Sequence, residues 1–200
     1  MSSLYWDLDV NNLKLKNCKH IFSKFGFPSI VVELGVYMGC TTNNLVNMIV
    51  PHIPNLKYFA IDPFEDSIDI KENLTEIKNL FLSALSEYKY KENIIFMQEK
   101  SFDGLIKLKL NNIKPQFIFI DGDHTASAVL NDLVLSFDIL EKGGIILCDD
   151  TTDWKYIDEK GNTDPQMSPR MAVETFIMCN WSRIDILPLP HGHQTAFVKL

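Results

Sequence analysis

The sequence predicts an α/β fold in which a largely parallel β-sheet carries helices on both faces. Short apolar runs rich in β-branched residues alternate with longer segments whose apolar residues recur every three or four positions. The short runs are apolar at consecutive positions, which is typical of strands buried on both sides. With 200 residues, the chain fits one domain, residues 1–200.

The expected elements follow in order along the chain. Parallel strands are expected at residues 29–34, 57–62, 93–97, 116–121 and 145–150. Helices are expected within residues 1–28 and at 41–50, 70–90, 101–110 and 129–140, with a last helix opened by Ser168 and Pro169. Ser101 is expected to cap the helix that it begins.

The C-terminal part breaks this alternation. Two strand-like runs, residues 182–187 and 195–200, have no helix between them and are expected to form a hairpin through residues 188–194. One antiparallel strand is therefore expected at the sheet edge. Residues 151–168 are polar and aperiodic, and we interpret them as a substrate loop. Within them Trp154, Tyr156 and Met167 would either cover a substrate or anchor the loop.

Composition excludes several classes of function. The net charge of −7 and the scattered lysines argue against a nucleic-acid partner. The four cysteines, Cys18, Cys40, Cys148 and Cys179, form no CxxC pair, so we expect reduced thiols rather than a zinc or redox site. With no signal-like N-terminus and no long apolar run, we expect a cytoplasmic protein with no membrane partner.

A ligand site is expected where the first two strands end. Gly35 and Gly39 bracket a tight turn into a helix, whose first N–H groups can bind an anion. Asp62 ends the second strand and suits a ribose diol. Tyr37 stands where a G-x-G-x-x-G motif has glycine, which argues against a pyrophosphate on this turn. The alternative is a strand–helix turn without a ligand.

Four motifs in order carry a family resemblance: "VVELGVYMGCTT", "FAIDPFE", "FIFIDGDH" and "LEKGGIILCDD". Together they resemble class I S-adenosylmethionine-dependent methyltransferases, in the form of small metal-dependent O-methyltransferases of the catechol type and of the macrocin and mycinamicin sugar type. The similarity extends from about residue 29 to residue 150. It implies a Rossmann-like, doubly wound seven-stranded sheet of order 3-2-1-4-5-7-6, with strand 7 antiparallel.

The resemblance also implies how S-adenosylmethionine would be held. Asp62 would bind the ribose, and Ser101 and Phe102 would lie beside the adenine. Asp121 would face the same crevice. The positions expected to surround the methionine moiety lie in and around the first glycine-rich turn: Glu33, Gly35, Tyr37, Gly39 and Thr41.

Three carboxylates are expected to meet at the neighbouring strand ends. Asp121 follows the fourth strand, and Asp149 and Asp150 end the fifth; neighbouring strands lie about 4.8 Å apart. Anions so close repel one another, which a hard divalent cation relieves: magnesium first, or manganese or calcium. In the related metal-dependent enzymes the matching positions hold the metal, and an acidic residue in place of the catechol-type Asn favours the sugar type. The alternative is a hydrated cluster without a metal.

His124, three residues after Asp121, is the candidate general base. An imidazole with a pKa of about 6.5 is mostly neutral at pH 7 and can accept a hydroxyl proton. The alternative is a solvated residue in the first turn of a helix that Asp123 would cap. We expect His191 and His193 to lie on an exposed turn.

The predicted function is therefore an S-adenosylmethionine-dependent, metal-dependent O-methyltransferase. Its acceptor would be a hydroxyl of a small molecule or carbohydrate. A metal-independent methyltransferase is the nearest alternative. A NAD-dependent oxidoreductase and a non-catalytic nucleoside-binding module are the alternatives from other classes.

Overall fold

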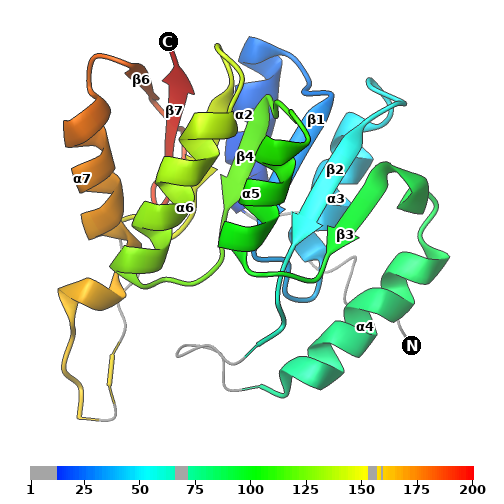
Figure 1. Cartoon of the computed structure of the whole chain (residues 1–200), viewed down its shortest axis with the longest axis horizontal. Helices are drawn as coiled ribbons and strands as arrows, with labels where there is room; N and C mark the ends of the chain where they lie inside the picture. The colour runs from blue at the N-terminus through cyan, green and yellow to red at the C-terminus, as the bar shows by residue number, and fades with distance from the viewer. Residues whose placement is uncertain (1–12, 66–71, 153–156, 159) are drawn as a thin grey trace.

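The computed structural model describes residues 13–65, 72–152, 157–158 and 160–200, and these form one mixed sheet of order β3-β2-β1-β4-β5-β7-β6 (Figure 1). The first five strands are mutually parallel, and β7 is antiparallel to both of its neighbours. The predicted sheet is thus confirmed, although β7 lies one strand inside the edge that β6 forms. The strands are β1 (Ile30–Leu34), β2 (Lys57–Ile61), β3 (Ile94–Met97), β4 (Phe117–Ile120), β5 (Ile145–Cys148), β6 (Ile184–Leu187) and β7 (Thr195–Lys199).

Helices cover both faces of the sheet, as the alternation predicts. Side chains of α2, α3 and α4 contribute to the core on one face, and those of α5, α6 and α7 to the core on the other. The helices are α2 (Leu13–Phe25), α3 (Cys40–Ile49), α4 (Leu74–Glu87), α5 (Ser101–Leu110), α6 (Ala126–Ile139) and α7 (Pro169–Asn180). None of them, within the described ranges, is long and apolar enough to cross a bilayer.

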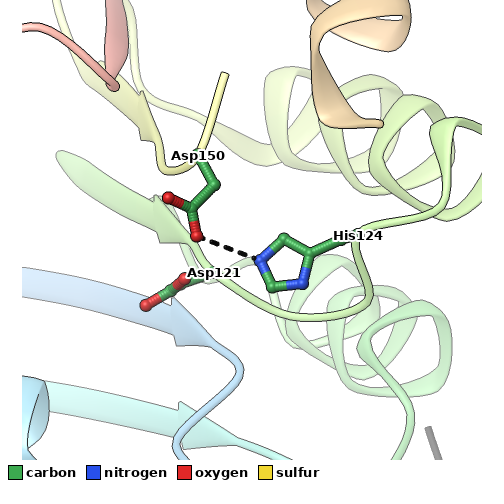
Figure 2. Close-up of side chains that lie close together, drawn as sticks. All are labelled: Asp121, His124 and Asp150. Carbon is green, nitrogen blue, oxygen red and sulfur yellow. Dashed lines mark ion pairs between the residues drawn. The ribbon is translucent and has the colours of Figure 1, made fainter. Parts of the chain in front are cut away.

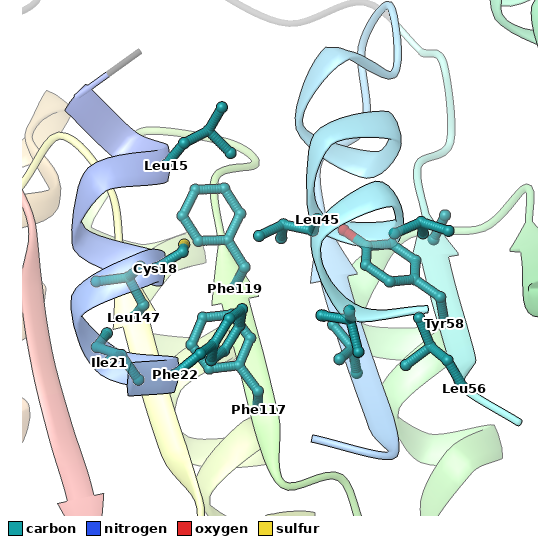
Figure 3. Close-up of a cluster of buried hydrophobic side chains, with 14 of the residues drawn as sticks. Leu15, Cys18, Ile21, Phe22, Leu45, Leu56, Tyr58, Phe117, Phe119 and Leu147 are labelled. Atoms are coloured by element: carbon teal, nitrogen blue, oxygen red, sulfur yellow. The ribbon is translucent and has the colours of Figure 1, made fainter. Parts of the chain in front are cut away.

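The residues of β4 show how the sheet is anchored. Phe117 and Phe119 point towards α2, where the ring of Phe22 meets that of Phe117 edge-on (Figure 3). The alternating residues Ile118 and Ile120 belong to the opposite core. Burying each such side chain contributes roughly 1.5–3 kcal/mol relative to exposure. Packing on both faces therefore gives the polar residues that follow β4 a fixed base.

Two expected helix caps are wrong. Ser101 is the first residue inside α5, and Lys100 holds the cap position without a side-chain hydrogen bond. The cap of α6 is Thr125, whose hydroxyl accepts a hydrogen bond from Ala128 N–H. Asp123 lies before this cap and accepts from Thr125 N–H instead. Ser101 and Asp123 are thereby available to face the crevice described below.

Parts of the expected substrate loop and of the N-terminal segment lie outside the described residues. Trp154 and Tyr156 lie outside them, as do residues 1–12 of the N-terminal segment. The expected loop 151–168 contains two short elements, a bridge between Ile157 and Thr163 and a 3₁₀ turn over Pro165–Met167. The part of this loop that is described therefore has local structure of its own.

Candidate active site

A cavity of about 340 Å³ opens at the carboxyl ends of β1, β2 and β4. This is the edge where open α/β sheets bind ligands. Thr41, Gly39 and Glu33 do not line this cavity. Six of the residues expected to bind the cofactor do: Gly35, Tyr37, Asp62, Ser101, Phe102 and Asp121.

Gly35 allows the first turn to pack directly against the end of β4. A Cβ at this position would lie 2.1 Å from the carbonyl oxygen of Asp121, and the residue has φ of 86°. Only glycine tolerates both the contact and this conformation. The close approach brings the turn after β1 and the side chain of Asp121 to the same side of the cavity.

Asp62 fastens the loops that form the cavity wall. Its Oδ2 accepts hydrogen bonds from Val36 N–H (2.8 Å) and Tyr37 N–H (2.9 Å), and its Oδ1 accepts from Phe64 N–H (2.7 Å). A carboxylate offers about four lone-pair sites, so at least one remains for a ligand hydroxyl. Asp62 can therefore shape the turn and still meet a ribose.

Non-glycine residues with positive φ gather around this edge. Tyr37 (φ 51°) and Phe64 (φ 52°) line the cavity, and Asp150 (φ 54°) lies at the end of β5. Bulky residues adopt this region only where the surrounding structure compensates for the strain, which is common at functional sites. Their concentration here supports the same location for the active site.

Glu33 is buried beneath the turn rather than exposed to the cavity. Its Oε2 accepts hydrogen bonds from Thr42 (2.5 Å) and Tyr58 (2.9 Å), and the residue is 0% exposed. Burial raises the pKa of Glu33 to about 8, although both hydrogen bonds act in the opposite direction. The residue expected to hold the methionine moiety is thus a neutral internal support near pH 7.

Asp121, His124 and Asp150 bring three potential metal ligands together (Figure 2). Their ligand atoms all lie within 4.8 Å of one another, and His124 Nε2 is 3.4 Å from Asp150 Oδ2. The three side chains come from the end of β4, the loop before α6 and the end of β5. Two carboxylates and an imidazole form a donor set that suits a divalent cation.

Asp149 is not a member of this group. It is 3% exposed, and its charge is the second cause, after burial, of the raised pKa of Cys18 on α2. Asp149 therefore lies on the α2 side of the sheet, whereas Asp150 belongs to the cluster. Of the predicted carboxylate trio, the structure brings together Asp121 and Asp150.

The β6–β7 turn lies beside this cluster because β7 runs antiparallel to β5. Thr151 N–H donates to the carbonyl oxygen of His193 at 2.7 Å, directly after Asp150. Asn17 on α2 donates to the carbonyl oxygen of His191 and to Oε1 of Gln194. His191 and His193 are half-buried rather than fully exposed.

The cavity is also lined by Asp132 of α6, which was not predicted from the sequence as a site residue. It is 2% exposed, and its carboxylate accepts a hydrogen bond from Ser101. The sequence does contain a sign of this residue. Asp132 lies on the same helical stripe as Val129, Leu133 and Ser136, and an acidic residue on such a buried stripe is unusual.

A match to a known protein family assigns this chain to a class of protein. Residues 32–151, more than half of the chain, match the model of a family described as "Methyltransferase domain". The chain therefore belongs to the methyltransferase-domain family. An uncharacterized protein of Acanthamoeba polyphaga mimivirus is 24% identical to it over 156 residues, which cover 78% of this chain. The chain spans 62% of the length of that relative.

Solved structures of methyltransferases share the fold over nearly all of the chain. An O-methyltransferase from Bacillus cereus, in complex with S-adenosylhomocysteine, superposes with a TM-score of 0.69 at 14% identity, covering 99% of this chain and 86% of the other. TomG from Streptomyces achromogenes, in complex with S-adenosylmethionine, gives 0.65 at 13% identity, with the same coverage of 99% and 86%. MycE of the mycinamycin pathway, in complex with Mg and S-adenosylhomocysteine, gives 0.59 at 14% identity over 90% of this chain and 47% of MycE.

Proposed function

We propose that this chain is an O-methyltransferase that transfers a methyl group from S-adenosylmethionine to a hydroxyl of a small molecule or sugar and uses a divalent cation. The observation that carries the proposal is the cluster of Asp121, His124 and Asp150. It lies next to the cavity, since Asp121 belongs to both. A methyl donor in the cavity and an acceptor at the cluster would then be neighbours.

The donor set of the cluster fits a divalent cation, with Asp121 and Asp150 as its oxygen ligands. When bound, such an ion would withdraw electron density from the acceptor hydroxyl and lower its pKa. The similarity in fold to MycE, whose structure holds Mg, supports this assignment. A sugar acceptor is the finer part of the proposal, and its support is Asp150, an acidic residue at the position where the catechol-type enzymes have Asn.

His124 would take the hydroxyl proton. Its Nε2 lies near Asp150, whose carboxylate would orient the ring and stabilise the imidazolium once the proton has been transferred. The acceptor oxygen would attack the methyl carbon in line as the carbon–sulfur bond breaks, leaving S-adenosylhomocysteine. The chain would contribute mainly by holding both reactants in position.

A second candidate is a metal-independent methyltransferase of the same fold. The 3.4 Å approach of His124 to Asp150 favours it, because an acid–imidazole pair can act as a base without an ion. The two candidates predict different responses to chelation. The family assignment favours both over a NAD-dependent oxidoreductase.

Calorimetry with S-adenosylhomocysteine, with and without magnesium, tests the proposal first. A screen of sugars and catechols with labelled S-adenosylmethionine then identifies the acceptor. We expect cofactor binding and a turnover that EDTA abolishes and added magnesium or manganese restores. Full turnover after exhaustive chelation would support the metal-independent candidate, and no cofactor binding would overturn both.

A further inference from the structure

A buried polar pair, Ser101 and Asp132, forms part of the wall of the cofactor cavity. Ser101 begins α5, and Asp132 lies in the middle of α6. The Ser101 hydroxyl donates a hydrogen bond to Asp132 Oδ1 at 2.5 Å. Asp132 is only 2% exposed, and both residues line the cavity. The pair is thus a built feature of the site and is not a surface contact.

The surroundings of this pair suit a flat heterocycle. Ile61, Phe102 and Ala128 line the same cavity, and Phe102 is 50% exposed although it belongs to the wall. An aromatic ring of this kind offers its face to a planar base. A base that packs on these apolar side chains would present its hydrogen-bonding edge to polar residues of the same cavity, Ser101 and Asp132 among them.

The hydrogen bond to Asp132 decides whether the Ser101 hydroxyl can contact a donor or an acceptor group of a ligand. A serine hydroxyl has one proton and two lone pairs, and here the proton is committed to Asp132. Its oxygen can then only accept a further hydrogen bond. Burial raises the pKa of Asp132 to about 7, against the lowering effect of the Ser101 hydrogen bond and with a smaller raising effect of Asp123. Once ionised, Asp132 cannot donate, and the direction of the bond is fixed.

We infer that Asp132 is a positioning residue that holds the Ser101 hydroxyl as an acceptor and thereby makes the cavity select a base with an exocyclic amino group over one with a carbonyl. The inference rests on the proposed function, because it assumes that S-adenosylmethionine occupies this cavity. An adenine amino group would donate to Ser101. The carbonyl of the deaminated base would instead meet the lone pairs of the same oxygen.

Two substitutions remove the acceptor role of the Ser101 hydroxyl in different ways. In Asp132→Asn, the amide nitrogen can donate to the Ser101 oxygen, which frees the hydroxyl to donate to a carbonyl. In Ser101→Ala, the acceptor itself is lost. The matched control is Asp138→Asn, since Asp138 forms a surface ion pair with Lys109 (2.6 Å) that also joins α6 to α5.

The experiment measures the binding of S-adenosylhomocysteine and of S-inosylhomocysteine by calorimetry at about pH 9, where Asp132 is ionised. The unsubstituted protein and Asp138→Asn are expected to prefer the adenosyl ligand by about tenfold or more, the range for one well-placed hydrogen bond. In Asp132→Asn and Ser101→Ala, the ratio of the two dissociation constants is expected to approach one.

Equal loss of affinity for both ligands in Asp132→Asn, with the ratio kept, would mean a purely structural role and would overturn the inference. A tenfold preference that survives Ser101→Ala would do so too, and this second variant decides if Asp132→Asn does not fold. If the unsubstituted protein binds S-adenosylhomocysteine without preference, the inference fails alone. If it binds neither ligand, the proposed cofactor site fails with it.

Discussion

The imidazole Nε2 of His124 lies 3.4 Å from Oδ2 of Asp150, although the two residues follow different strands of the sheet. The side chain of His124 is 17% exposed and that of Asp150 is 26% exposed. Partial burial keeps this pair from being fully screened by solvent and salt. The pairing follows from the parallel register of β4 and β5, in which Ile120 lies opposite Cys148.

Replacing His124 with Ala is expected to lower methyl transfer by about 10²–10⁴-fold, the usual contribution of a positioned general base. The affinity for S-adenosylhomocysteine should change little, because His124 does not line the cofactor cavity. Single-turnover kinetics and calorimetry on the same preparation measure both quantities. The control is His20→Ala, an exposed residue of α2, which should keep full activity. Unchanged kinetics in His124→Ala would remove it from the mechanism.

The two adjacent aspartates after β5 should differ in metal binding. Asp150→Asn and Asp121→Asn each remove a charged oxygen from the cluster and are expected to weaken Mn²⁺ binding by at least about tenfold. Asp149→Asn should bind Mn²⁺ normally, since Asp149 lies outside the group formed by Asp121, His124 and Asp150 and its charge acts on Cys18 of α2. Titration of Mn²⁺ by calorimetry or electron paramagnetic resonance measures this. An equal loss in all three variants would restore Asp149 to the ligand set.

This difference between neighbours also shows how far the sequence could lead. The apolar runs of β4 and β5 predicted the strands, and the acids after them predicted a carboxylate cluster at one edge. The sequence did not separate Asp149 from Asp150, because both follow the end of β5. The sequence could not reveal that Asp150 has φ of 54° and that Thr151 N–H is held by the carbonyl of His193, because both depend on β7 pairing with β5.

Contacts between distant segments were similarly out of reach. Asn17 and His191 are 174 residues apart, and their hydrogen bonds exist only because α2 and the β6–β7 turn meet at one edge of the fold. Sequence periodicity describes one element at a time and carries no information on such pairs. Asp132 is the opposite case, since its place on an apolar helical stripe could have marked it as functional.

Asp62 should affect folding and cofactor binding together. Asp62→Asn replaces one of the two oxygens that accept hydrogen bonds from Val36, Tyr37 and Phe64 with a donor, so at least one partly buried N–H loses its partner. The expected cost is about 1–3 kcal/mol in the free energy of unfolding. Affinity for S-adenosylhomocysteine should fall as well. Denaturant unfolding and calorimetry measure the two effects, with a substitution of an exposed residue, Glu87→Gln, as the control. Normal stability of Asp62→Asn would show that these hydrogen bonds do not stabilise the fold.

Glu33 should make the protein less stable as the pH rises. Burial raises its pKa from 4.5 to about 8 in the folded state. Between these values the folded chain keeps a proton that the unfolded chain has released, so the folded state binds more protons. Stability is therefore lost as pH increases through this window, by up to about 1.4 kcal/mol per pH unit, and levels off above the folded pKa.

Glu33→Gln removes this titration while keeping an oxygen that accepts from Thr42 and Tyr58. Urea unfolding of both proteins in steps from pH 5 to about pH 9 isolates the contribution, since Asp132 and the other titrating groups cancel in the difference. We expect the unfolding free energy of Glu33→Gln to fall less steeply with pH. Burial of Glu33 is unfavourable only when its carboxyl group is ionised. Parallel pH profiles for the two proteins would therefore mean that Glu33 already carries its charge at neutral pH, stabilised by Thr42 and Tyr58.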